Sequence, residues 1–323
     1  MRRYLCVFLA LLLLLLTGCG TRTDKKAEVN IYVLSGPTGI GAMHLWEQSE
    51  ADEKGYRFTM AGSNEEIVAA LSNGTADIAC VATNLAATLY NKTDGGVTCL
   101  AVNTLGVLHL LTLGEPPESL AELKGKTVYL PGQGANPEYI LRYVLTGNGL
   151  AEDDVTFSFV GESGELLNVW QSEPEAVILA PQPMATSLLT RYAAQGAAEA
   201  FDMTEEWDRI SDGESTLMMG CVVARTDFCE EAPRTVERFL TAYRASIEAA
   251  RSDVAGTAAL CEKYGLLPQA ALAERAIPSC GVTFVGGEEM RTQLGGYLRV
   301  MFDADPKSVG GKLPEDDFYY GVF

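Results

Sequence analysis

The sequence is poor in histidine and lacks the closely spaced residue pairs that bind metals. It contains two histidines, His44 and His109, and its eight cysteines include no C-x-x-C pair. H-x-x-x-H, H-E-x-x-H and G-x-S-x-G are also absent. Structural and catalytic metal sites usually contain ligands at such spacing, and many serine hydrolases contain the last motif. We therefore expect no metal, no cofactor and no catalytic residue, and we interpret both histidines as core or structural residues.

Basic residues are also scarce. The chain has 24 Lys and Arg against 43 Asp and Glu. Loss of Arg2 and Arg3 with a signal peptide leaves 22 basic residues and a net charge of −21. A chain this acidic repels phosphate backbones, which argues against a nucleic-acid partner. Its 323 residues, 47% of them hydrophobic, are enough for a large core and about two lobes.

The longest apolar run lies at the N-terminus, in "MRRYLCVFLALLLLLLTGCG". Two arginines, an apolar run from Leu5 to Leu16 and small residues are typical of a secretory signal, and "LTGC" resembles the bacterial lipobox. In such lipoproteins the cysteine becomes the lipidated mature N-terminus, which predicts a signal peptide at 1–18, lipid on Cys19 and a flexible tether at 19–28. An ordinary signal or an N-terminal membrane helix is the alternative, although the run is short for a membrane span.

Six cysteines remain after the signal and the lipid site are set aside, and most lie in apolar contexts such as "DIACVAT" and "MMGCVVA". Free cysteine is among the most buried residue types, so we expect buried free thiols. One or two disulfides are the alternative in an exported protein.

Short β-rich runs alternate with helix-patterned segments through most of the chain. "VNIYVL", "YRFTMAG", "ADIACVAT" and "VTCLAVNT" read as strands, and "SNEEIVAALSNG" between them reads as a capped helix. After "GVLHLLTL" the order begins again, and "VYLPGQGANPEY" repeats the strand, glycine loop and helix of "YVLSGPTGIGAM". This pattern predicts α/β lobes with largely parallel sheets.

These segments, with "GTADIA", "LKGKTV" and "MGCVVARTDFCEEAPRTVERFLTAY", together resemble the substrate-binding proteins of ABC importers, most of all the nitrate, sulfonate and thiamine-precursor group. The resemblance implies a type II periplasmic-binding fold, in which two lobes are joined by two hinge strands and hold a ligand in the cleft between them. It places lobe 1 at 29–115 and 213–323 and lobe 2 at 116–212. The crossings are expected near Leu110 to Gly114 and Leu217 to Cys221.

Loops at the carboxyl ends of strands are the candidate ligand site, because ligands of open parallel sheets bind there. The first such loop has the glycine spacing of a phosphate-binding loop at Gly36 and Gly41 but Ala42 and Met43 in place of Lys and Ser or Thr. It therefore offers backbone amides and hydroxyls without a full positive charge. The predicted ligand-binding residues are Ser35, Gly36, Thr38, Gly39, Thr83, Asn84, Gln133, Asn136, Tyr139 and Gln182.

Each of these residues has a purely structural alternative. The glycines fit a tight turn, Asn84 and Asn136 fit helix caps, and Gln182 fits an exposed turn. The six candidate loops contain no Lys or Arg, so we expect a small organic ligand that is neutral or carries at most one negative charge. The family suggests alkanesulfonates, nitrate-like anions and heteroaromatic vitamin precursors, and Tyr139 offers a stacking face for the last class.

The sequence thus predicts a solute-binding lipoprotein on the outer face of the cell membrane, monomeric, which delivers a ligand to an ABC permease and its ATPase. A ligand-sensing surface lipoprotein is the first alternative. An enzyme is the second, because the fold also carries thiamine-pyrimidine synthases and small menaquinone-pathway enzymes. The cysteine-rich iron motif of the synthases is absent, and a lipid anchor argues against biosynthesis inside the cell.

Overall fold

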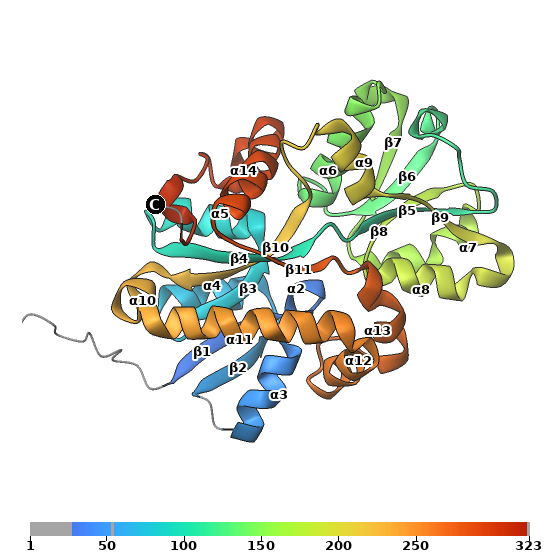
Figure 1. Cartoon of the computed structure of the whole chain (residues 1–323). Coiled ribbons are helices and arrows are strands. Elements are labelled where there is room, and N and C mark those ends of the chain that lie inside the picture. Colours follow the sequence, from blue (N-terminus) through green and yellow to red (C-terminus); the bar gives the residue numbers. More distant parts are fainter. Residues whose placement is uncertain (1–27, 53–54, 322–323) are drawn as a thin grey trace, which may run out of the picture.

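A computed structural model describes residues 28–52 and 55–321 of the chain. The predicted signal peptide, Cys19 and all but the last residue of the predicted tether lie outside these ranges. The described residues form two β-sheets in two lobes, which Figure 1 shows side by side. The predicted two-lobed α/β architecture is confirmed.

The sheet of lobe 1 is built from both ends of the chain, in the order β11-β4-β10-β3-β1-β2. β1 pairs in parallel with β2 and β3, whereas β10 runs antiparallel between β3 and β4. Its strands are β1 (Val29–Leu34), β2 (Tyr56–Ala61), β3 (Ile78–Ala82), β4 (Val97–Leu105), β10 (Met218–Arg225) and β11 (Val282–Val285).

The sheet of lobe 2 has the order β7-β6-β8-β5-β9. β6 pairs in parallel with β7 and β8, and β5 runs antiparallel to both β8 and β9. Four strands of each sheet therefore share one direction. The strands of lobe 2 are β5 (Leu108–Leu113), β6 (Thr127–Pro131), β7 (Thr156–Val160), β8 (Val177–Pro181) and β9 (Ala197–Asp202).

Helices cover both faces of the lobe 1 sheet, because its central strands are buried on both sides. The helices α3, α11 and α12 pack on one face, and α4, α5 and α14 pack on the other (Figure 1). The helices of lobe 1 are α2 (Pro37–Ile40), α3 (Met43–Asp52), α4 (Asn64–Ser72), α5 (Thr83–Lys92), α10 (Thr226–Glu231), α11 (Pro233–Ser252), α12 (Val254–Lys263), α13 (Ala270–Ala276) and α14 (Gly287–Ala304).

The helices of lobe 2 are α6 (Asn136–Gly147), α7 (Val169–Ser172), α8 (Met184–Arg191) and α9 (Met203–Ile210). Local capping fixes several helix starts. The Ser63 hydroxyl accepts a hydrogen bond from the backbone N–H of Glu66, as predicted, and Asp202 caps α9 in the same way. One apolar cluster continues from lobe 1 into lobe 2, where Trp207 of α9 lies 5.6 Å from Tyr297 of α14 between ring centroids.

The crossings between the lobes lie earlier in the chain than predicted. β4 of lobe 1 ends at Leu105 and β5 of lobe 2 begins at Leu108, so the first crossing is 106–107. The return falls in 211–217, between α9 and β10. Leu110 to Gly114 instead lie in or beside β5, and the predicted lobe boundary at 115 is wrong because the apolar run of β5 belongs to the second sheet.

Burial agrees with the predicted state of the cysteines. The six that the structure describes are free, and all but Cys229 are buried. Burial raises the pKa of the Cys80 thiol to about 12, so it is unreactive at neutral pH. Within the described residues, no helix combines the length and hydropathy needed to cross a bilayer.

Candidate functional site

The predicted site residues follow four strands that end at the facing edges of the two lobes. In lobe 1 they follow β1 and β3, and in lobe 2 they follow β6 and β8. Each of these strands leads within a few residues into a helix, namely α2, α5, α6 or α8. Helix N-termini present unpaired backbone N–H groups, so this edge is suited to binding polar groups.

Two asparagines join the lobes at this edge. Asn84 is the second residue of α5, Asn136 is the first residue of α6, and Nδ2 of Asn136 donates a hydrogen bond of 3.2 Å to Oδ1 of Asn84. Asn136 is 8% exposed, and its Oδ1 is a buried acceptor without a partner among the described residues. A buried carboxamide oxygen without a donor is costly, which makes it a natural partner for a ligand N–H or O–H.

The glycine loop after β1 is held by contacts with Leu266 and Asn103. The Ser35 hydroxyl donates to the carbonyl of Leu266 at 3.0 Å, and the Thr38 carbonyl accepts from Nδ2 of Asn103 at 3.0 Å. Gly36 has a φ of 117°, which favours glycine there. A Cβ at Gly39 would lie 2.4 Å from Cδ1 of Leu266, so close packing accounts for this glycine. Nothing in these contacts occupies the Thr38 hydroxyl.

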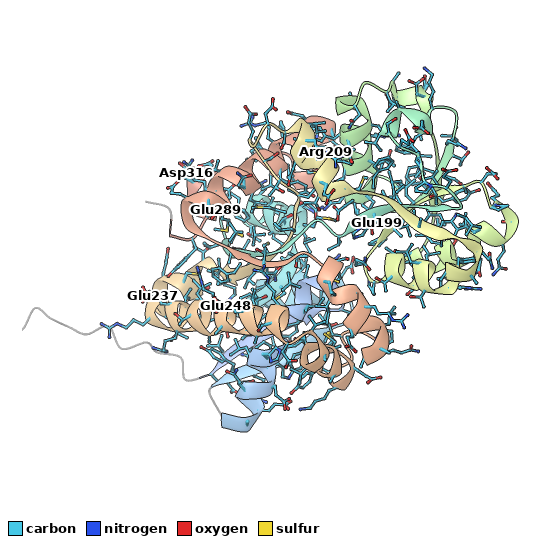
Figure 2. The ribbon with its side chains drawn as sticks, turned by 45° about the vertical axis from the view of Figure 1, so that its right-hand side comes forward. Glu199, Arg209, Glu237, Glu248, Glu289 and Asp316 are labelled. Carbon is cyan, nitrogen blue, oxygen red and sulfur yellow. The ribbon has the colours of Figure 1, made fainter. Side chains whose placement is uncertain are left out.

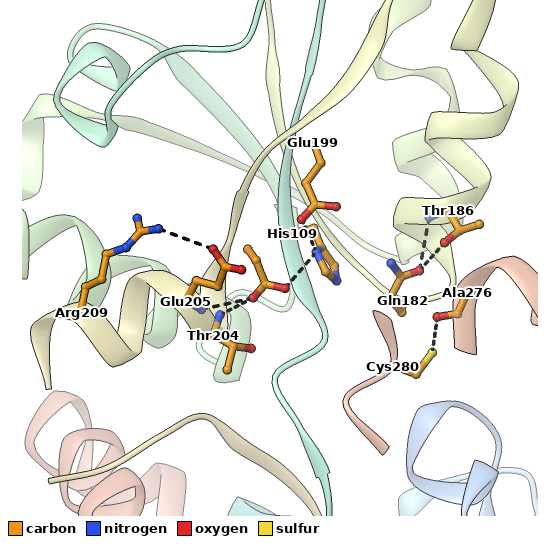
Figure 3. Close-up of polar contacts among 10 residues, drawn as sticks. His109, Gln182, Thr186, Glu199, Thr204, Glu205, Arg209, Ala276 and Cys280 are labelled. Atoms are coloured by element: carbon orange, nitrogen blue, oxygen red, sulfur yellow. Dashed lines mark hydrogen bonds and ion pairs between the residues drawn. The ribbon is translucent and has the colours of Figure 1, made fainter. Parts of the chain in front are cut away.

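Two other predicted residues already have structural partners. Thr83 is fully buried and its hydroxyl donates to the carbonyl of Met218 at 2.6 Å. Gln182 is 4% exposed, and its Oε1 accepts from the backbone N–H and the hydroxyl of Thr186, which caps α8 (Figure 3). The exposed turn considered for Gln182 is therefore wrong.

The first turn of α6 contains an acidic group that the sequence analysis did not include. Gln133 is exposed, and the next residue, Gly134, donates its backbone N–H to Oε2 of Glu138 at 2.8 Å. Glu138 is also paired with Arg142 at 2.8 Å. Its carboxylate lies at the helix N-terminus that an anionic ligand would use, which disfavours a multiply charged anion.

Tyr139 forms a second bridge between the lobes. It lies one turn into α6 and donates its hydroxyl to Oδ2 of Asp305, at the end of α14, at 3.1 Å. The same side chain lines a cavity of about 520 Å³ between these two helices, together with Tyr143 and Phe157. Tyr139, which was predicted to stack on a heteroaromatic ligand, thus lines an aromatic pocket beside the loops.

Two clusters were missed by the sequence analysis. Nδ2 of Asn103, in β4, donates to the hydroxyl of Tyr243 at 2.9 Å and to the backbone carbonyl of Thr38. Asn103 thereby links the glycine loop to α11. His109 of β5 faces the carboxylates of Glu199 and Asp202 (Figure 3). Neither partner set follows a sequence motif, because the contacting residues are at least 65 positions apart.

The surface of both lobes carries acidic residues, in keeping with the composition. Exposed carboxylates lie on both lobes, among them Glu237 and Glu248 of α11, Glu289 and Asp316 in lobe 1 and Glu199 in lobe 2 (Figure 2). Such a surface repels anions at long range, so the local helix ends and amides have to supply any selectivity.

Solved structures of known proteins share this fold. The crystal structure of an ABC transporter protein from Parabacteroides distasonis is 23% identical, covers 91% of this chain and 99% of its own, and superposes with a TM-score of 0.76. The periplasmic aliphatic sulphonate binding protein SsuA of Escherichia coli is 15% identical over 91% of this chain and 96% of its own, with a TM-score of 0.70.

The periplasmic nitrate-binding protein NrtA of Synechocystis is more distant, at 13% identity over 80% of this chain and 69% of its own, with a TM-score of 0.54. These likenesses confirm the predicted periplasmic-binding fold and the resemblance to binding proteins of ABC transporters.

Sequence comparison adds a family. No curated protein matches the chain. The model of a family described as menaquinone biosynthesis matches residues 46–276, which include most of both lobes and the predicted site residues from Thr83 onward. Because this match spans more than two thirds of the sequence, the chain belongs to the menaquinone biosynthesis family.

Proposed function

We propose that the protein is the solute-binding lipoprotein of an ABC importer, and that it captures a small organic ligand between its lobes. The observation that carries the proposal is the contact between Asn84 and Asn136, which joins two helix N-termini across the lobes and leaves Oδ1 of Asn136 buried and without a partner among the described residues. A ligand bound there contacts both lobes at once, which is how a binding protein couples capture to closure.

The ligand in this proposal is neutral or carries one negative charge and has an N–H or O–H donor. The donor pairs with Oδ1 of Asn136, and the exposed Gln133 and the Thr38 hydroxyl offer further hydrogen bonds. The Glu138 carboxylate beside Gly134 opposes a divalent anion. Heteroaromatic compounds that carry an N–H group meet both conditions, and Tyr139 favours this class by offering an aromatic face beside the loops. Monoanionic alkanesulfonates meet the charge condition, but only those with a hydroxyl group on the alkyl chain supply the donor.

Calorimetry on the mature protein against a panel of both classes, with phosphate as a divalent control, tests the ligand site. Removing the Asn136 carboxamide in Asn136→Ala is expected to weaken binding by about 1–3 kcal/mol, because a buried hydrogen-bond partner is lost. Asn64→Ala is the matched control, since Asn64 is also the first residue of a helix but is exposed on α4. Equal affinity in both variants, or tight phosphate binding, would place the ligand elsewhere.

The lipid anchor and the extracytoplasmic location rest on the "LTGC" segment. We propose that Cys19 carries the lipid and holds the monomeric protein at the outer face of the membrane, next to its permease and ATPase. Metabolic labelling with a fatty acid should be lost in Cys19→Ser, whereas Cys6→Ser should keep it because that cysteine leaves with the signal peptide. Label retained in Cys19→Ser would contradict the anchor.

A second candidate is an enzyme, and the family match over 46–276 favours it. The predicted site residues offer mainly amides and hydroxyls, which bind a ligand well but transfer protons poorly at neutral pH, and the Glu138 carboxylate beside them is paired with Arg142. Turnover of a ligand found by calorimetry, followed by mass spectrometry, separates the two functions. An unchanged ligand supports capture, and a product would establish catalysis. A sensor would also leave the ligand unchanged, and is distinguished by a neighbouring kinase gene in place of permease and ATPase genes.

A further inference from the structure

A buried histidine and two carboxylates meet where β5 enters lobe 2. Nδ1 of His109 lies 3.1 Å from Oε1 of Glu199 and 3.7 Å from Oδ2 of Asp202. One ligand atom from each residue lies within 4.8 Å of the other two. His109 lies in β5, Glu199 is the third residue of β9, and Asp202 is its last residue. Figure 3 shows His109 and Glu199 close together, with Gln182 nearby.

The imidazole is oriented so that its Nδ1 faces two negatively charged carboxylates. His109 is 2% exposed, and its Nε2 is buried without a hydrogen-bond partner among the described residues. In the tautomer that carries its proton on Nε2, the lone pair of Nδ1 points at two carboxylate oxygens. This arrangement requires a proton or a metal cation between the three groups, since three acceptors repel one another.

The neighbouring basic residue does not supply the missing charge. Arg209 of α9 is the nearest arginine drawn in Figure 3, and its ion pairs are with Glu205 and Glu206. Among the described residues, the ion-pair partner of both Glu199 and Asp202 is His109 itself. The cluster therefore has a formal charge of −2 when the imidazole is neutral.

The two carboxylates differ in how firmly they are held and in how exposed they are to solvent. Asp202 is fixed, because its Oδ1 accepts from the backbone N–H groups of Thr204 and Glu205, which leaves Oδ2 for the cluster. Glu199 has a side chain that is 38% exposed, which gives an ion a path from solvent.

We propose that His109, Glu199 and Asp202 bind one divalent transition-metal ion, with Zn²⁺ as the best match. One imidazole nitrogen and two carboxylate oxygens suit Zn²⁺ among the first-row metals, and three protein ligands leave a fourth position for water. The site is separate from the Asn84–Asn136 contact, and it does not depend on which small molecule the lobes capture.

The test measures Zn²⁺ affinity of the mature chain, purified without a polyhistidine tag, by competition with a chromophoric chelator. We expect one Zn²⁺ per chain, and His109→Ala should weaken binding by more than the roughly 10–100-fold typical of losing an outer partner. Glu199→Gln, which keeps the size of the side chain, should also weaken it. Because the chain contains two histidines, NMR should show Zn²⁺ shifting the imidazole signals of His109 and leaving those of His44 in place.

Matched variants separate this site from other metal-binding groups. His44→Ala removes the other histidine, whose ring is hydrogen-bonded to the Thr257 hydroxyl at 2.8 Å, and should keep full affinity. Cys229→Ser removes the one described thiol that is not fully buried, and should also keep it. No binding in the parent protein, or affinity that survives His109→Ala, overturns the proposal and leaves a proton as the cation of the cluster.

Discussion

The charge of His109 links the pH of the medium to the stability of lobe 2. Burial alone would lower the pKa of this imidazole, but the hydrogen bond with Glu199, the charges of Glu199 and Asp202 and the backbone of Ser279 together raise it above the ordinary value of 6.5. The same hydrogen bond lowers the pKa of Glu199 from its ordinary 4.5 against the opposing effect of burial. Each group is thus stabilised in its charged form.

These shifts define a pH window. The contribution of His109 is fully present below pH 6.5 and is lost as the pH rises through its raised pKa. The contribution of Glu199 is present above pH 4.5 and is lost as the pH falls through its lowered pKa. In metal-free protein, His109→Gln should therefore lower the free energy of unfolding most between these two values, by about 1–3 kcal/mol, and progressively less at higher pH.

Urea unfolding of both proteins across this range measures the effect, and His44→Gln is its control. Burial lowers the pKa of His44 against the charges of Asp253 and Glu47, so His44 destabilises the folded protein in acid and its replacement should relieve that loss. The two variants should thus respond to acid in opposite directions. A His109→Gln effect that does not change with pH would show that its pair with Glu199 is not ionised.

Single residues also show where sequence reasoning succeeds and where it stops. The positions after β1, β3, β6 and β8 were predictable, because glycine, asparagine and proline mark the loops that follow apolar strands. The hydrogen bonds of Thr83 and Gln182 were not, since a hydroxyl or amide that bonds another part of the chain has the same local sequence as one that faces a ligand. The His109 cluster combines residues 90 positions apart, and only the fold brings them together.

At the scale of elements, the crossing between β4 and β5 depends on one glycine. A Cβ at Gly106 would lie 2.1 Å from the Thr204 hydroxyl oxygen and 3.0 Å from Cδ1 of Leu217, so the outgoing and returning crossings touch at this residue. Leu217 is the residue before β10, and Thr204 lies in the first turn of α9. The close approach at Gly106 therefore brings the two connections between the lobes into contact.

Gly106→Ala should destabilise the protein by about 1–3 kcal/mol through overpacking, and should also change how readily the lobes close. Gly164→Ala is the control, because a Cβ there meets nothing within 4 Å. Thermal unfolding and ligand affinity of the two variants give the comparison. Equal melting temperatures would mean that the crossing has room to adjust.

The alternation of strands and helices was predictable from the sequence, but the position of the lobe boundary was not. "GVLHLLTL" is apolar enough to continue lobe 1 or to begin lobe 2, and the period of a buried strand does not reveal its sheet. The pairing of Leu108 with Pro181 and of His109 with Asp202 assigns the segment to the second sheet. Long-range pairing of this kind decides topology and is absent from local patterns.

At the scale of the whole molecule, the lobes touch through polar contacts that a ligand can replace or reinforce. Asn84 contacts Asn136 and Tyr139 contacts Asp305, and each pair has one member in each lobe. On the apolar side Trp207 packs near Tyr297. The polar interlobe contacts are few, whereas the apolar cluster that contains Trp207 and Tyr297 continues from one lobe into the other and holds the lobes together.

Small-angle scattering should show a smaller radius of gyration when the protein is saturated with a ligand from the calorimetric panel. The reason is that contacts with both lobes are available only when the lobes are closed. Tyr139→Phe removes the bridge to Asp305 and should increase the radius of the free protein while leaving the saturated value closer to that of the parent. A radius that does not change at saturation would contradict closure.

The place of β10 at the centre of the first sheet also determines the order in which the chain can fold. Lobe 2 is one continuous segment from 108 to 210, whereas β10 is inserted between β3 and β4 from more than a hundred residues further along. Until Met218–Arg225 has emerged, β3 and β4 have no neighbour on their shared side and expose apolar edges. A chain that emerges from its N-terminus during synthesis therefore completes its second lobe first, and its first lobe needs protection from aggregation until the C-terminal third arrives.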